Sequence, residues 1–318
     1  MKTGESVKKI VTIGGGAGSF TVLKGLKKYP IAITAIVTTF DSGGSSGLLR
    51  DEFGILPPGD VRRCLVALSE EEKILRRLFM FRFEKKSSLQ GHSFGNLFLT
   101  ALSSIFKDDN LAIEKAGELL NINGKVLPVS LSKSHLCATL EDGTIIEGET
   151  NIDIPKHDSE SKIKKIFLEP KAKLNSKARK AIMEADIIVV GPGDLYTSII
   201  PNFLVGGMLE AMKKTKAKKI YIANLMTKWG ETNNLSASDC AKAILFYAGV
   251  SKFDYIVCNS RKMSDKTLRS YAKEKKYPMV VDKSLNRFGK EIILKPLWKD
   301  SGIIRHNSDL LAKIITSL

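Results

Sequence analysis

The chain has 318 residues, of which 43% are hydrophobic and 26% charged, and its formal net charge is +16. These values are typical of a globular protein with one large α/β domain or two smaller ones, and the positive charge favours anionic partners. The four cysteines are widely separated, which argues against a disulfide framework or a CxxC zinc site. No apolar run is long enough to cross a membrane and the N-terminus lacks a signal region, so we expect a cytoplasmic protein without membrane insertion.

Two clusters of lysine, in residues 162–180 and 213–219, contribute to the positive charge. Neither cluster has aromatic residues at a spacing suited to base stacking, and no helix-turn-helix, zinc-finger or RNA-binding signature accompanies them. Nucleic-acid binding is therefore the weaker interpretation. Surface lysines that only keep the protein dissolved are the plain alternative, and phosphorylated metabolites are the other class of anionic partner.

The first part of the chain predicts a strand–helix–strand unit. Residues 8–14 form a β-branched run, residues 20–29 have helical spacing, and residues 31–39 form an apolar strand without alternation. Such a strand is expected where helices cover both faces of a sheet. Further helices are predicted over residues 61–83, 94–106 and 111–120.

The same order of elements returns downstream. Strands are predicted over residues 185–194, 218–227 and 254–260, and they alternate with helices over residues 197–212 and 236–249. Strands that alternate with helices indicate an open α/β sheet that is mostly parallel.

A different pattern interrupts this order between residues 124 and 170. Asp142 and Gly143 stand between two β-type runs, which is a strong signal for a hairpin. We therefore expect a single ligand-binding domain over residues 1–318, with a small antiparallel β-rich insert at residues 124–170.

A glycine cluster follows the first predicted strand and opens the first helix. Glycine lets the backbone turn tightly and approach a phosphate, whose charge is balanced by free N–H groups and by the helix dipole. The third glycine of a GxGxxG pattern is replaced by serine, so this loop alone is also compatible with a tight turn that binds nothing. The candidate residues are Gly14, Gly15, Gly16, Gly18 and Ser19.

A second polar cluster begins just after the second predicted strand, where a dinucleotide-binding fold places its ribose-binding acid. Asp41 suits that role, or it suits a hydrated Mg²⁺, which takes only one or two carboxylates. Arg50 could bind phosphate through two parallel hydrogen bonds. Between them, a nest of backbone N–H groups for an anion could be formed by Gly43, Gly44, Ser45, Ser46 and Gly47.

Two further motifs carry polar residues at predicted helix starts. Asp60 is placed to cap the helix that follows it or to serve the site. Arg62 lies in the first helical turn, where its charge opposes the helix dipole and makes an anionic partner plausible. Ser93 can cap the next helix, while His92 and Asn96 could point into the site. A structural role for His92 is equally well supported.

Polar residues also end the later predicted strands. In open α/β sheets, ligands bind in the crevice outside the carboxyl ends of the strands. The helix after the 185–194 strand offers further N–H groups to an anion. The residues that we expect at this edge are Gly191, Gly193, Asp194, Tyr196, Thr197, Asn224 and Asn259.

Taken together, these motifs resemble the bacterial gluconeogenesis-factor family, which is related to archaeal 2-phospho-L-lactate transferase. The segments that carry the resemblance are IGGGAGS, DSGGSSGLLRDEFG, PPGDVRRCLVAL, GHSFGNLFLTAL, GPGDLYTSIIPN and NLMTKWGET, in this order from about Lys8 to beyond Asn259. The resemblance implies a Rossmann-like three-layer αβα fold with a small insert. It also implies binding of a UDP-sugar such as UDP-N-acetylglucosamine, and a role in cell shape and in growth on gluconeogenic carbon sources.

Three residues depart from the pattern of that family. Ser42 replaces a second aspartate after Asp41, Arg63 stands where asparagine is common, and Asp194 stands where serine is more usual. Loss of the paired acid weakens the case for a two-carboxylate metal site and hence for catalysis. Asp41 and Asp60 are the candidate ligands if Mg²⁺ binds.

Two polar residues near the C-terminus lie where the family also tends to carry polar residues, Tyr271 and Arg305. Arg305 follows a short apolar run. It could close over a diphosphate, or it could pair with an acid at the surface.

The leading functional hypothesis is a regulatory protein that binds a nucleotide diphosphate sugar without robust turnover, because no nucleophile or general base stands out. The alternative is a Mg²⁺-dependent transferase of the 2-phospho-L-lactate transferase type, acting on a nucleotide diphosphate donor. An NAD(P)-dependent dehydrogenase and a nucleic-acid-binding scaffold rank lower. We expect no tightly bound organic cofactor, and we consider regulatory protein partners and a homodimer as hypotheses.

Overall fold

A seven-stranded parallel sheet and a separate three-stranded antiparallel sheet organise the computed structural model, which describes residues 7–70, 73–84, 87–154, 161–298 and 303–318. The strand order of the large sheet is β10-β9-β8-β7-β1-β2-β3. This confirms the predicted α/β class with a mostly parallel sheet and a small antiparallel insert. The strands are β1 (Lys9–Gly14), β2 (Ala32–Val37), β3 (Lys125–Pro128), β7 (Ile187–Val190), β8 (Lys218–Ile222), β9 (Phe253–Asn259) and β10 (Gly289–Lys295).

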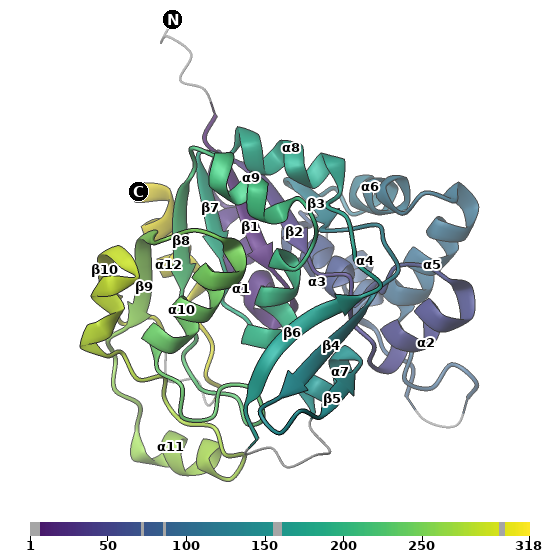
Figure 1. Cartoon of the computed structure of the whole chain (residues 1–318). Helices are drawn as coiled ribbons and strands as arrows, with labels where there is room; N and C mark the ends of the chain where they lie inside the picture. Colours follow the sequence, from purple (N-terminus) through teal and green to yellow (C-terminus); the bar gives the residue numbers. More distant parts are fainter. Residues whose placement is uncertain (1–6, 71–72, 85–86, 155–160, 299–302) are drawn as a thin grey trace, which may run out of the picture.

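Both faces of the large sheet are covered by helices, which explains why its strands are apolar without alternation. Along β7, Ile187 and Val189 pack into one hydrophobic cluster, whereas Ile188 and Val190 pack into the other. Three layers result (Figure 1). The first cluster includes residues of α1 (Gly16–Leu26), α3 (Gly59–Leu68) and α12 (Ser308–Ser317), and the second includes residues of α8 (Ser176–Glu184), α9 (Met208–Lys214) and α10 (Ala237–Ala248).

The helix predicted over residues 61–83 is wrong, because the structure has two helices there, α3 and α4 (Lys73–Met80). Ser69 ends α3 with an extended backbone, and its hydroxyl donates a hydrogen bond to the carbonyl of Leu120 at 2.8 Å. A tertiary contact therefore ends the helix. The other helices of this region are α2 (Gly44–Phe53), α5 (Phe94–Phe106) and α6 (Asp109–Leu119).

The helix predicted over residues 197–212 is also wrong. A single π-helical turn, η1 (Leu195–Ile199), is followed by a 3₁₀ turn, η2 (Ile200–Phe203), and α9 begins only at Met208. Pro201 lacks the N–H that an α-helix would need at this point, and Gly207 has a φ of +96°. These two residues divide an apolar run that has helical spacing.

The predicted hairpin at Asp142 and Gly143 is confirmed. It joins β4 (His135–Leu140) to β5 (Ile145–Glu147) in antiparallel pairing, and β6 (Ile163–Glu169) pairs with the other edge of β4. The short helix α7 (Glu149–Asp153) follows β5. We call the segment from β4 to β6, with α7, the antiparallel unit. β3 lies earlier in the 124–170 segment and belongs to the parallel sheet.

The C-terminal part adds elements for which the sequence pattern made no assignment. These are α11 (Asp265–Ala272), η3 (Lys283–Arg287), β10 and α12. β10 extends the parallel sheet beside β9, and α12 packs so closely on α1 that a Cβ on Gly25 would overlap the carbonyl of Ser308.

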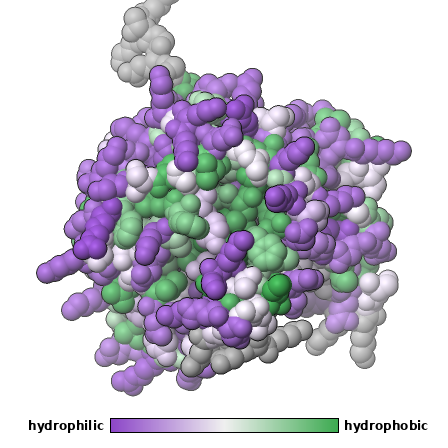
Figure 2. Space-filling model, in the orientation of Figure 1, coloured by the Kyte–Doolittle hydropathy of each residue, from purple (hydrophilic) through white to green (hydrophobic). Residues whose placement is uncertain are grey.

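All four cysteines are free, as predicted, and all four are buried. None of the helices in the described ranges is both long and apolar enough to pass through a membrane. Hydrophilic side chains cover much of the face seen in Figure 2, with hydrophobic groups visible between them.

Candidate functional site

Three helices begin side by side at the carboxyl edge of the parallel sheet. A Cβ on Gly59, at the start of α3, would lie 2.5 Å from Oγ of Ser46 in α2 and 3.0 Å from Oδ2 of Asp41. A Cβ on Gly15, before α1, would overlap the carboxylate of Asp60. The N-cap residues of α1, α2 and α3 are Gly15, Gly43 and Pro58, whose own side chains cannot cap a helix. Backbone N–H groups of several helices therefore converge on one place, which favours negative charge.

Asp60 links two of these helices. It belongs to the first turn of α3, but its Oδ1 accepts a hydrogen bond from the backbone N–H of Gly16 in α1 at 2.9 Å. Burial raises the pKa of this carboxyl to about 6, and the nearby carboxylate of Asp41 adds to the shift, while the guanidinium of Arg63 at 3.6 Å opposes it. Asp60 thus caps α1, a helix distant in sequence.

At the start of α2, the carboxylate of Asp41 closes a turn by a backbone hydrogen bond, and Gly44 is exposed. Oδ1 of Asp41 accepts from the N–H of Gly43 at 2.8 Å. Gly44 has a φ of +43°, and a Cβ built on it would meet no atom of the described structure within 4 Å. Arg50 donates to the carbonyl of Asp41 at 3.4 Å and pairs with Asp51 at 2.7 Å. The predicted nest is in fact the first turn of a helix, and the space beside Gly44 is open.

Behind this turn lies a buried polar network. Arg62 Nε donates to Oδ1 of Asn96 at 2.9 Å, Nδ2 of Asn96 donates to Oγ of Ser45 at 3.1 Å, and Ser45 contacts Nδ1 of His92 at 3.1 Å. Arg62 also donates to the carbonyl of Phe79, and burial lowers its pKa to about 10. The structure therefore brings Arg62, His92 and Asn96 together with Ser45, where they hold the first turn of α2 in place.

The loop after β7 forms the next wall. Asn224 holds Gly193 at both backbone groups, since Oδ1 accepts from its N–H at 3.0 Å and Nδ2 donates to its carbonyl at 2.7 Å. Gly191 has a φ of +74°. A Cβ on Gly18 would overlap the carbonyl of Pro192, so α1 lies directly against this loop. The glycines at 18, 191 and 193 permit that approach.

The antiparallel unit contributes α7 to the same edge. Oγ of Ser42 accepts from the N–H of Thr150 at 3.0 Å and lies 3.2 Å from its hydroxyl. Ser42, the departure from the family's paired aspartates, thus joins the segment between β2 and α2 to α7. Burial raises the pKa of Glu149 well above its ordinary value, and the nearby carboxylates of Asp41 and Asp153 add to this shift.

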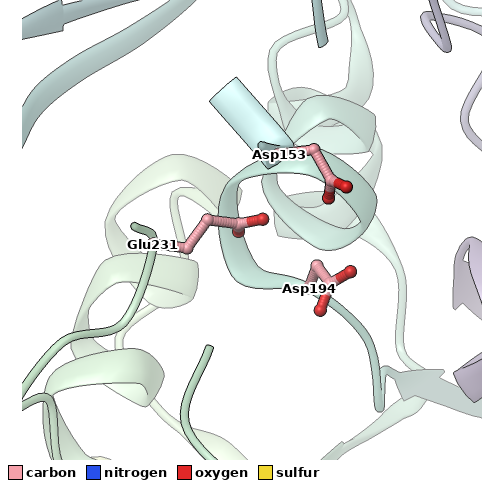
Figure 3. A group of neighbouring side chains, drawn as sticks. All are labelled: Asp153, Asp194 and Glu231. Carbon is pink, nitrogen blue, oxygen red and sulfur yellow. The ribbon is translucent and has the colours of Figure 1, made fainter. Parts of the chain in front are cut away.

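A cluster of three acids lies beside α7, and we call Asp153, Asp194 and Glu231 the acid cluster (Figure 3). One carboxylate oxygen of each lies within 4.8 Å of the others, a spacing that could hold a metal ion. Nζ of Lys228 lies among them, 2.9 Å from Asp194, 3.2 Å from Glu231 and in contact with Asp153. Burial alone would lower the pKa of Lys228, but the three carboxylates outweigh it and raise that pKa.

Comparison with known proteins gives a family. Residues 10–298 match the family described as 2-phospho-L-lactate transferase CofD. A protein named gluconeogenesis factor from Halalkalibacterium halodurans is 46% identical over 311 residues, which cover 97% of this chain and 95% of the relative. The gluconeogenesis factor of Bacillus subtilis is 41% identical over 314 residues and 98% of both chains. The chain belongs to the CofD-like gluconeogenesis factor family.

A solved structure agrees with this assignment. A crystal structure of a UPF0052 family protein from Bacillus halodurans superposes with a TM-score of 0.92 at 44% identity, covering 98% of this chain and 100% of that one. The resemblance inferred from the motifs is thereby confirmed at the level of the family.

Three other expected residues of this family member lie in other surroundings. Asn259 accepts from the N–H groups of Arg261 and Leu297, and so joins the ends of β9 and β10. The hydroxyl of Tyr271 accepts from the N–H of Ile304 at 2.9 Å, and Arg305 is exposed. The structure does not bond these three to the residues around Asp41 and Asp60.

Sequence reasoning missed four charged residues at this edge, namely Glu149, Asp153, Lys228 and Glu231. Lys228 and Glu231 stand in the segment NLMTKWGET, which carried part of the resemblance but was given no role. Glu149 and Asp153 lie in the antiparallel unit, and no local signal shows that this unit reaches the carboxyl edge.

A groove of about 1020 Å³ lies elsewhere, against β1, β2 and β3 where these strands begin. Its walls come from α6 and α8, whose charges pair across it, as Lys177 does with Glu114 at 3.1 Å. The converging helix starts, the glycine loops and the buried carboxyls with raised pKa, Asp60, Glu149 and Glu231, lie at the other end of the sheet, so that end is the candidate site.

Proposed function

We propose that this protein binds a nucleotide diphosphate sugar of the UDP-N-acetylglucosamine kind at the carboxyl edge of the sheet, and thereby supports growth on gluconeogenic carbon sources and cell shape. The observation that supports this proposal most directly is that α1, α2 and α3 begin side by side. A diphosphate offers several oxygens in a small volume, which suits N–H groups arriving from more than one helix. Arg63 lies close by and is half exposed, so it can meet the ligand's charge.

A divalent cation would accompany the diphosphate. Asp41, Asp60 and Glu149 line the same place, and carboxylates would repel phosphate unless a cation or protons intervened. Asp41 uses Oδ1 for its turn, while Oδ2 faces the start of α3. Oxygen ligands of this kind suit Mg²⁺, which keeps several waters and needs only one or two carboxylates. Asp41 and Asp60 would hold the ion, which would neutralise charge between protein and diphosphate.

Calorimetric titration with UDP-N-acetylglucosamine tests the proposal, with Mg²⁺ and with EDTA. Gly44→Ala places a methyl group in the open space before α2, and we expect it to weaken binding at least about tenfold. Gly143→Ala is the matched control, because Gly143 also has a positive φ and open space around a Cβ but lies in the distant hairpin. Absence of heat and of any thermal shift at millimolar ligand would remove the proposal.

A transferase acting on a nucleotide diphosphate donor is the second candidate. Glu149 favours this function. Because its pKa is raised, its carboxyl holds a proton close to Asp41 at neutral pH. A protonated carboxyl at that place could act as a general acid. Incubation of the protein with a nucleotide diphosphate donor and hydroxyl acceptors, with and without Mg²⁺, decides the question. Product that requires Mg²⁺ and disappears in Glu149→Gln supports it, and absence of product with every pair tested counts against it.

A further inference from the structure

We propose that Lys228 is the resident cation of the acid cluster, so that a lysine ammonium rather than a divalent metal ion occupies the space between Asp153, Asp194 and Glu231. The same ammonium fastens the antiparallel unit to the carboxyl edge of the parallel sheet. This proposal does not rest on the identity of the nucleotide ligand.

The geometry excludes two cations in one place. A metal ion shared by three carboxylates lies between them, about 2.0–2.6 Å from each oxygen for Mg²⁺ or Ca²⁺. Nζ of Lys228 already lies in that space, within 3.2 Å of Glu231 and 2.9 Å of Asp194 and in contact with Asp153. The ammonium donates hydrogen bonds to Asp153 and Asp194 and forms an ion pair with Glu231.

The surrounding bonds fix this arrangement. The side chain of Glu231 is fully buried, and its oxygens also accept from the N–H of Tyr196 at 2.8 Å and the hydroxyl of Thr197 at 2.9 Å. The backbone N–H of Lys228 donates to the hydroxyl of Thr232 at 2.7 Å. A buried carboxylate needs a charged partner, and Lys228 is held where it provides one.

The three acids come from separate parts of the fold. Asp153 ends α7, Asp194 precedes η1, and Glu231 follows β8. α7 also carries Glu149 and Thr150, which approach the residues after β2. By holding Asp153, Lys228 keeps α7 at the candidate site, and it therefore acts as a positioning residue.

Counting bound Mn²⁺ by electron paramagnetic resonance on the full-length, nucleotide-free protein tests the proposal. Lys228→Ala should bind one more Mn²⁺ per chain than the wild type, and the additional ion should be lost in the double variant with Asp153→Asn. Lys290→Ala removes an exposed lysine paired with Asp254 at 2.7 Å and serves as the control, with no added ion expected.

Two outcomes overturn the proposal. One is a folded Lys228→Ala protein, checked by circular dichroism, that binds no additional Mn²⁺. The other is a single Asp153→Asn variant that loses a Mn²⁺ ion bound by the wild type. If Lys228→Ala does not fold, the comparison of Asp153→Asn with the wild type still decides, because equal Mn²⁺ counts support a cluster that holds no metal.

Discussion

Replacing Asp60 with asparagine should stabilise the ligand-free protein at pH 8 while weakening ligand binding. Burial raises the pKa of Asp60 from 3.8 to about 6. A difference of roughly two pKa units corresponds to about 3 kcal/mol between the protonated and ionised forms. Because the folded state binds this proton more tightly, the contribution is most favourable below pH 4, is lost as the pH rises through 6, and then stays constant.

Asparagine does not ionise, so the variant does not lose stability at this position as the pH rises through 6. Its side-chain oxygen can still accept from the N–H of Gly16, and the pair with half-exposed Arg63 contributes little. We expect a gain of about 1–3 kcal/mol in the free energy of unfolding at pH 8 and almost none at pH 4. Such a gain at a binding residue is the usual trade between stability and function.

Urea denaturation followed by circular dichroism, at intervals from pH 4 to pH 8, measures the effect. The difference between variant and wild type isolates Asp60 from the other carboxyls. Asp254→Asn is the control: bonds from Lys290 and the N–H of Lys219 outweigh burial and lower the pKa of Asp254 from 3.8, so this variant should lose a similar amount of stability at every pH from 4 to 8. Two results would refute a raised pKa at Asp60. One is a variant that is less stable than the wild type at pH 8. The other is a difference in the free energy of unfolding that is the same at every pH.

Three further changes test other parts of the site. Gly18→Ala should cost about 2–3 kcal/mol of stability, because its methyl group overlaps the carbonyl of Pro192, and an unchanged midpoint of thermal denaturation would contradict this close approach. Asn224→Ala should cost about 2–3 kcal/mol by removing both bonds to the loop after β7, and an unchanged urea midpoint would contradict that role. Binding of ligand with Mg²⁺ should release protons from Glu149, so calorimetry in buffers of different ionisation enthalpy should show release in the wild type and little in Glu149→Gln.

Local patterns were sufficient for much of the fold. β-branched runs predicted β1 and β2, and Asp142 with Gly143 predicted the hairpin, because these signals depend on neighbours in sequence. The two wrong helices have different causes: Pro201 and Gly207 are local signals within an apolar run of helical spacing, whereas the end of α3 depends on a distant contact. Ser69 leaves α3 to bond Leu120, which lies 51 residues further along the chain, and no helical spacing records such a contact.

The candidate site was predictable to the extent that it depends on strand ends. The loops containing Asp41 and Asp194 follow parallel strands, so their shared edge follows from the topology. The acid cluster does not follow, because Asp153 and Lys228 are 75 residues apart and meet only when the antiparallel unit docks. The internal network of Arg62 likewise depends on packing that composition does not reveal.

The central claim is that the starts of α1 and α2 bind the diphosphate of a nucleotide sugar. A crystal structure of the protein with UDP-N-acetylglucosamine and Mn²⁺ tests it most directly, since anomalous scattering locates the metal. We expect the diphosphate at the first turns of α1 and α2, with Mn²⁺ at Asp41 and Asp60. A nucleotide in the groove against the first residues of β1, β2 and β3, or a diphosphate that touches neither helix start, would contradict it.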